Sequence, residues 1–209
     1  LVFNDGNTLL LNGIDRYVFV GTGRLLDESD LVTYADQVQS MYALRDGTVL
    51  EMSKTVGYKP RTDSGFEKIT DGLTGLSTVP EKGWIHDLPK GERIIAPIQA
   101  EVNLLVYAGS LPPENECLSG LAANIYAREF TRGASQLREK DGEPFVESIY
   151  SAEGAVGVEL IKLYKGEGAT QPTVRVAITR GTDGKMTSFP VNLPGGSADH
   201  RMSWRLLGQ

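Results

Sequence analysis

Residues 16–47, RYVFVGTGRLLDESDLVTYADQVQSMYALRDG, decide the fold class that the sequence predicts. The stretch opens with Tyr17–Val20, a run of aromatic and β-branched residues that favours a strand, and this run stops at a Gly-Thr-Gly sequence. After a polar segment, a second apolar run, Met41–Leu44, ends at Asp46-Gly47, a dipeptide suited to a tight turn. We therefore predict two short strands joined by a long polar loop.

The same pattern of short apolar runs and turn signals continues along the chain. Asp-Gly dipeptides, which tolerate the positive φ angles of hairpin turns, recur between the runs. Apolar residues alternate in one of them, so that Val174, Val176 and Ile178 share a strand face. Many short strands separated by turns predict an all-β sandwich, barrel or propeller. The predicted strands are Thr8–Leu11, Tyr17–Val20, Ser40–Leu44, Arg93–Ile98, Asn103–Ala108, Pro144–Tyr150, Val156–Tyr164, Val174–Thr179 and Thr187–Val191.

Three segments do not follow this pattern. Glu28–Met41 has the composition for a helical turn behind a capping serine. Leu118–Gln136 fits a helix by propensity and a strand by its alternation, and the sequence leaves both structures open. Ser53–Glu81 is polar and rich in turn residues, so we predict a long exposed excursion there.

Composition, net charge and the length of the apolar runs argue against several classes of protein. The 209 residues are 40% hydrophobic, enough for a packed core, and the net charge of −6 argues against binding to nucleic acid. No apolar run is long enough to predict membrane insertion. Cys117 is the only cysteine, so an internal disulfide is impossible. Because the chain begins with Leu1, we expect it to be part of a longer, exported precursor.

Motifs for catalysis or cofactor binding are incomplete. Gly21-Thr22-Gly23 lacks the third glycine of a dinucleotide loop and the lysine of a P-loop. His86 is predicted to lie on a strand face and His200 in a solvated loop, and no serine sits in a nucleophile elbow. The acids of Asp27–Asp30 lack the spacing of a calcium loop. We therefore predict no catalytic residue, no cofactor site and no metal site.

Four stretches, in this order, resemble the carboxy-terminal β-propeller region of the PilY-type proteins of bacterial type IV pili. Tyr17–Leu26 with Gln39–Gly47 looks like the family's strand, Gly-Thr-Gly turn and following Q-x-x-Y strand. The second is Gly83–Pro89 with Gly91–Ile94, and the third is the cysteine-bearing loop Leu111–Cys117. The last is Ser203–Leu206, which is similar to the family's closing SWREL.

This resemblance implies one domain, residues 1–209, made of the later blades of a larger propeller and ending at the natural carboxy terminus. The blades would be antiparallel, with long loops between strands. The function would be non-enzymatic: an exported adhesin and assembly factor at the pilus tip or cell surface, outer membrane-associated or periplasmic. It would support pilus biogenesis, attachment and twitching motility. Its partners would be minor pilins and a host or abiotic surface receptor. The family's calcium loop has no counterpart here, so no cofactor is expected.

Two other functions are alternatives to this one. Related propellers hold pyrroloquinoline quinone, but a quinoprotein dehydrogenase needs a tryptophan that stacks on the cofactor and a set of calcium ligands. Trp84 and Trp204 both lie in motifs that look structural. The other alternative is a propeller that binds glycans or proteins and has no connection with pili.

Overall fold

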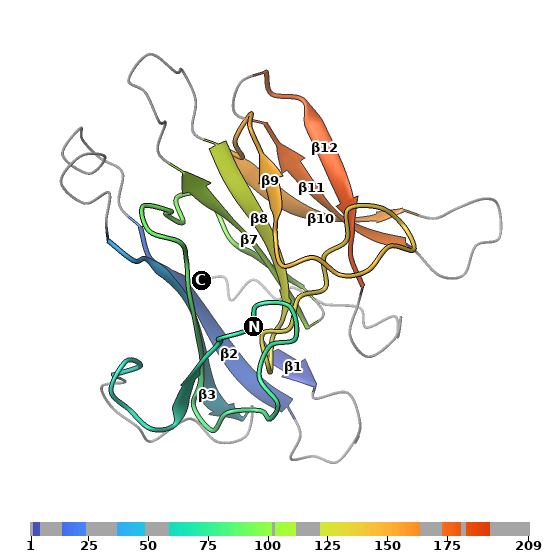
Figure 1. Ribbon diagram of the computed structural model, residues 1–209. Coiled ribbons are helices and arrows are strands. Elements are labelled where there is room, and N and C mark those ends of the chain that lie inside the picture. The colour runs from blue at the N-terminus through green and yellow to red at the C-terminus, as the bar shows by residue number, and fades with distance from the viewer. Residues whose placement is uncertain are drawn as a thin grey trace, which may run out of the picture.

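The computed structural model describes residues 2–4, 14–23, 37–48, 59–101, 103–111, 122–163, 173–180 and 183–192 (Figure 1). These residues form three β-sheets and no helix, which confirms the predicted all-β class. In the described ranges no helix is long and apolar enough to cross a membrane. The three sheets do not close into a barrel or a ring within the described part of the chain.

Sheet 1 has the strand order β1-β2-β3-β5-β4. Its strands pair antiparallel except for β4 and β5, which run parallel. Sheet 2 is an antiparallel meander with the order β6-β7-β8-β9, and sheet 3 is a second meander, β10-β11-β12. The bounds in sheet 1 are β1 Val2–Asn4, β2 Ile14–Gly21, β3 Ser40–Thr48, β4 Phe66–Lys68 and β5 Gly83–Asp87. Those in sheets 2 and 3 are β6 Gln99–Glu101, β7 Leu104–Leu111, β8 Ala122–Glu129, β9 Ile149–Ser151, β10 Gly157–Leu163, β11 Thr173–Thr179 and β12 Met186–Pro190.

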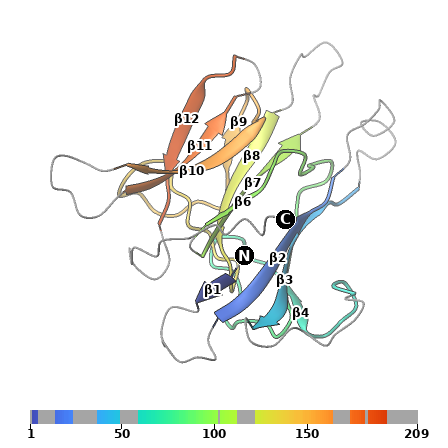
Figure 2. The ribbon, with the colours of Figure 1, turned by 180° about the vertical axis from the view of Figure 1, so that it is seen from behind.

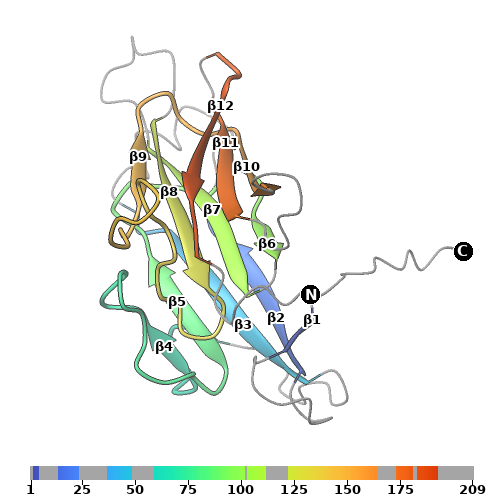
Figure 3. The same ribbon diagram turned by 90° about the vertical axis from the view of Figure 1, so that its right-hand side faces the viewer.

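The sheets stack in the order of the sequence, with sheet 2 in the middle (Figures 1 and 2). Side chains alternate between the two faces of a strand, so sheet 2 contributes to two cores. On β8, Ala123, Ile125 and Ala127 pack in the core that includes sheet 3, whereas Tyr126 packs in the core that includes sheet 1. The view in Figure 3 shows the strands of the layers running in similar directions. Sheet 2 is therefore covered on both faces.

Most predicted strands are found in the structure. Val174, Val176 and Ile178 are all buried, as their alternation predicts. A hairpin turn with Gly184 at positive φ joins β11 to β12 at Asp183-Gly184. The ambiguous segment Leu118–Gln136 contains a strand, β8, and no helix in its described residues.

Three sequence predictions are wrong. Arg93–Ile98 is not a strand: Arg93 makes only an isolated bridge to Ser110, and Pro97, which has no N–H, follows where the chain crosses between sheets. Pro144–Tyr150 forms a strand only from Ile149 onward.

Asp46-Gly47 is not a turn either, because β3 continues to Thr48. The pairing with β2 shifts here, and Gly47 has a φ of 71°, so the dipeptide belongs to a β-bulge.

The described part of Ser53–Glu81 is less exposed than predicted, since it contains β4 and the buried side chain of Ile69. Several other predictions lie outside the described residues and stay predictions: those on Thr8–Leu11, Asp27–Asp30, the helical turn within Glu28–Met41, Cys117, His200 and Trp204.

Candidate functional site

The outer face of sheet 1, which points away from sheet 2, carries exposed apolar side chains on β2 and β3. Tyr17, Met41 and Ala43 lie in the core with sheet 2, so the residues between them on β2 and β3 face outward. Val20 pairs with Tyr42 across the two strands, and its side chain remains 42% exposed. Strand alternation thus places apolar side chains on a solvent-facing sheet surface.

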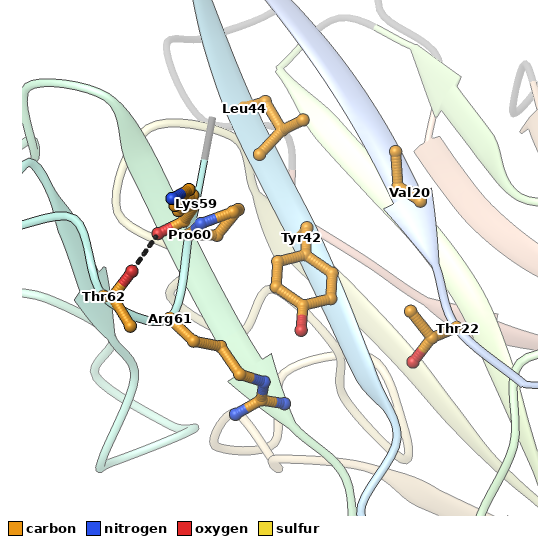
Figure 4. Close-up of a pocket in the computed structure, with 8 residues that line it drawn as sticks. All are labelled: Val20, Thr22, Tyr42, Leu44, Lys59, Pro60, Arg61 and Thr62. Atoms are coloured by element: carbon orange, nitrogen blue, oxygen red, sulfur yellow. Dashed lines mark hydrogen bonds between the residues drawn. The ribbon is translucent and has the colours of Figure 1, made fainter. Parts of the chain in front are cut away.

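This surface forms the floor of a groove of about 440 Å³ that is open to solvent (Figure 4). Figure 4 shows the Tyr42 ring in the middle, with β2 on one side and the segment 59–62 on the other. Apolar atoms dominate the lining. The groove is lined by Val20, Thr22, Tyr42, Leu44, Lys59, Pro60, Arg61 and Thr62.

Arg61 is held at the edge of the groove by contacts with sheet 1. Its guanidinium lies 2.9 Å from the Asp87 carboxylate, donates to Ser40 Oγ at 2.6 Å, and sits 5.9 Å from the centre of the Tyr42 ring. Burial acts to raise the pKa of Asp87, but hydrogen bonds from Arg61, Lys68 and Ser40 hold it well below its usual range. Asp87 is therefore charged at neutral pH and anchors the side chain that borders the groove.

The groove combines apolar contact area with positive charge. None of its eight lining residues is a histidine, a cysteine or a carboxylate. Its charged lining residues are Lys59 and Arg61, so the edge is basic in a chain whose net charge is −6. An apolar floor with a basic edge fits a partner that presents an apolar side chain beside an acidic one.

A second candidate site is a buried polar network between sheets 1 and 2. Arg128 on β8 is fully buried and donates from Nε to the Tyr107 hydroxyl at 3.0 Å and from Nη2 to His86 Nε2 at 3.0 Å. Its other nitrogen, Nη1, donates to the carbonyl oxygens of Gly72 and Gly133. One guanidinium therefore joins β5, β7, β8 and two loops.

His86 in this network is neutral. Arginine can only donate, so His86 Nε2 must accept, and the proton therefore sits on Nδ1 and is donated to the Tyr107 hydroxyl 2.8 Å away. Burial, helped by the positive charge of Arg128, lowers the pKa of His86 to about 3. With 4% of its surface exposed, His86 lies on a strand face, as predicted, and its role in this network is structural.

This state of His86 predicts a pH effect on stability. The pKa of His86 is lower in the folded state than in the unfolded state. The stability that depends on neutral His86 is therefore complete above pH 6.5 and is lost as the pH falls toward 3. Relative to a His86→Gln variant, the wild type should lose about 1.4 kcal/mol of unfolding free energy per pH unit below 6.5. Urea unfolding of both proteins at pH 7, 6 and 5 measures the difference. A difference that stays constant over this range would contradict a neutral buried His86.

The sequence predicts neither the groove nor the network as a site, although groove residues lie in the motifs of residues 17–26 and 39–47. Tyr42 belongs to the Gln39–Gly47 motif, and Thr22 of the Gly-Thr-Gly motif lines the groove at the end of β2. Arg61 gave no sequence signal, because its partner Asp87 lies 26 residues away. For the network a signal existed: Asn124, Tyr126 and Arg128 alternate with apolar residues along β8.

In the described residues no group of three or more histidine, cysteine, aspartate or glutamate side chains is placed to hold a metal ion. The predicted absence of catalytic, cofactor and metal sites stays a prediction. No protein family, no curated protein and no solved structure matches the chain.

Proposed function

We propose that the three stacked sheets are successive blades of a β-propeller. Two observations support this arrangement. Sheets 2 and 3 are up-and-down meanders, and so are β1, β2, β3 and β5 of sheet 1. Each sheet also packs face to face on the next one along the chain, and the first strand of sheet 3, β10, contacts the first strand of sheet 2, β6. Radial repetition of such sheets builds a propeller.

On this scaffold we propose a non-enzymatic adhesin and assembly factor of the type IV pilus, exported and carried at the pilus tip or cell surface. The support is the ordered set of PilY-type motifs together with their placement. Strands β2 and β3, which carry the first motif, are neighbours in sheet 1, and β5, which carries the second, pairs with β3. Within these motifs Trp84 is fully buried, whereas Tyr42 opens into the groove.

The groove is the proposed contact surface, and a minor pilin is its proposed occupant. This function depends on one observation: an apolar floor centred on Tyr42 with a basic edge at Lys59 and Arg61. Charge complementarity then requires a pilin surface that places an apolar side chain on Tyr42 and a carboxylate near Lys59. Binding needs no ion, so removing calcium should leave it unchanged.

Replacing Tyr42 with alanine should weaken minor-pilin binding at least tenfold, because a central aromatic residue of a contact surface carries a large share of the binding energy, about 1–2 kcal/mol or more. Biolayer interferometry with the purified minor pilins of the same bacterium, with and without calcium, measures the loss. Tyr150→Ala is the matched control, since Tyr150 lies on β9 of another sheet and is 62% exposed.

Equal affinities of wild type and Tyr42→Ala would remove the groove from the contact surface. A well-folded protein that binds glycans and no minor pilin would instead favour a general binding propeller. Visible absorbance from a bound quinone would favour a dehydrogenase.

A further inference from the structure

The segment that leads from sheet 1 to sheet 2, residues 88–94, is bonded to both sheets; we call it the connector. Toward sheet 1, the amides of Leu88 and Ile94 donate to the carbonyl oxygens of Gln39 and Thr22 at 2.9 and 3.1 Å. Toward sheet 2, Arg93 exchanges two backbone hydrogen bonds with Ser110 on β7, at 2.9 and 2.6 Å. The connector therefore fastens one layer to the other.

Glu92 lies in the middle of the connector, and its side chain is fully buried. Its Oε2 accepts a hydrogen bond from Asn124 Nδ2 at 2.8 Å. Oε1 is buried without a hydrogen-bond partner and lies over Gly109, where an added Cβ would come within 1.7 Å of it. The carboxyl group thus fits against sheet 2 only because position 109 is a glycine.

A buried carboxylate with one unpaired oxygen is costly, whereas a carboxylic acid in the same place is not charged. The charged and titratable groups that face Glu92 do not remove this cost. Burial raises its pKa to about 7, with a further increase from the negative charge of Glu147, and the Asn124 amide and Tyr126 hydroxyl lower it only in part. The positive charge of Arg128 lies next to Tyr126 and Tyr107, but it is committed to His86, Tyr107, two carbonyl oxygens and an ion pair with Glu147 at 3.4 Å.

We propose that Glu92 is a proton-controlled clasp between sheets 1 and 2: with its proton the connector is closed on β7, and loss of the proton loosens it. Because the carbonyl of Thr22 accepts from the connector, the loosening reaches the rim of the outer-face groove. The clasp lies in the connector itself and does not depend on what occupies the groove.

Hydrogen exchange of the Arg93 and Ser110 amides, corrected for intrinsic rates, tests the clasp on the whole chain. The measured quantity is the protection in the wild type divided by the protection in Glu92→Gln. This ratio should fall by about thirtyfold between pH 5.5 and 8.5, because the Glu92 carboxylate is hydrated in the open state and buried in the closed one. Dividing by the protection of the variant removes the effect of His86 titration, because both proteins contain His86. Glu153→Gln, at an exposed carboxylate on the surface, should follow the wild type.

A direct titration keeps the test valid if Glu92→Gln does not fold. In the wild type, the ¹³C resonance of the Glu92 carboxyl should titrate near pH 7, and the amide shifts of Arg93 and Ser110 should move with the same midpoint. A Glu92 midpoint at or below pH 5, or a protection ratio that does not change with pH, would overturn the proposal.

Discussion

Replacing Trp84 with alanine should lower the free energy of unfolding by about 3–5 kcal/mol, the usual range for truncation of a buried aromatic side chain. Trp84 is fully buried in the core between sheets 1 and 2. Its indole N–H donates to the Phe130 carbonyl at 2.6 Å, so truncation both leaves a cavity and removes this buried hydrogen bond. The residue joins the two layers by packing and by this hydrogen bond.

Denaturant unfolding of the wild type, Trp84→Ala and Trp84→Phe separates these two contributions. Phenylalanine keeps most of the apolar contact and removes the hydrogen bond. Trp84→Phe should therefore lose less unfolding free energy than Trp84→Ala. Leu73→Ala, at a residue that is 41% exposed, is the control and should cost less than about 1 kcal/mol. A loss below 1 kcal/mol for Trp84→Ala would contradict the central position of Trp84 in this core.

The strands of this chain could be predicted where pattern and burial coincide. The alternation of Val174, Val176 and Ile178 works because β11 has one face on the core shared with sheet 2. The strands of sheet 2 are harder to predict from the sequence, since both faces of this sheet are buried. In β7 the residues on both faces are apolar or small. The sequence therefore lacks the alternation of apolar and polar residues that marks a strand with one exposed face.

The two candidate sites could not be predicted as sites because they depend on long-range pairing. The groove needs residues 59–62 beside β3, and the network needs β5, β7 and β8 side by side. Asp46-Gly47 shows the same limit on a smaller scale. A positive φ at Gly47 serves a hairpin turn or a bulge equally well, and the pairing with β2 decides between them.

Replacing Arg128 with methionine is expected to cost about 3–5 kcal/mol, the range for removing one member of a buried charged network. Methionine has a similar length, so the cavity is small and the loss reports on polar contacts. His86 Nε2 and the carbonyl oxygens of Gly72 and Gly133 would lose their hydrogen bonds from Arg128 in a buried region. The Tyr107 hydroxyl would lose one of its two donors and keep the hydrogen bond from His86. Arg132→Met is the matched control, because Arg132 is exposed in the turn after β8, and it should change stability by no more than about 0.5 kcal/mol.

The Arg128→Met variant also separates a polar role from simple packing through His86. Arg128 lowers the pKa of His86 by its charge, and without it Nε2 is free to carry a proton toward the Glu147 carboxylate, 3.6 Å away. The pKa of His86 should therefore rise in the variant, and unfolding by acid should begin at a higher pH than in the wild type. NMR titration of the His86 ring in both proteins measures this shift. A stability loss with an unchanged His86 titration would mean that Arg128 acts by filling space. A stability loss together with the upward shift of the His86 pKa would mean that the charge and hydrogen bonds of Arg128 hold sheets 1 and 2 together.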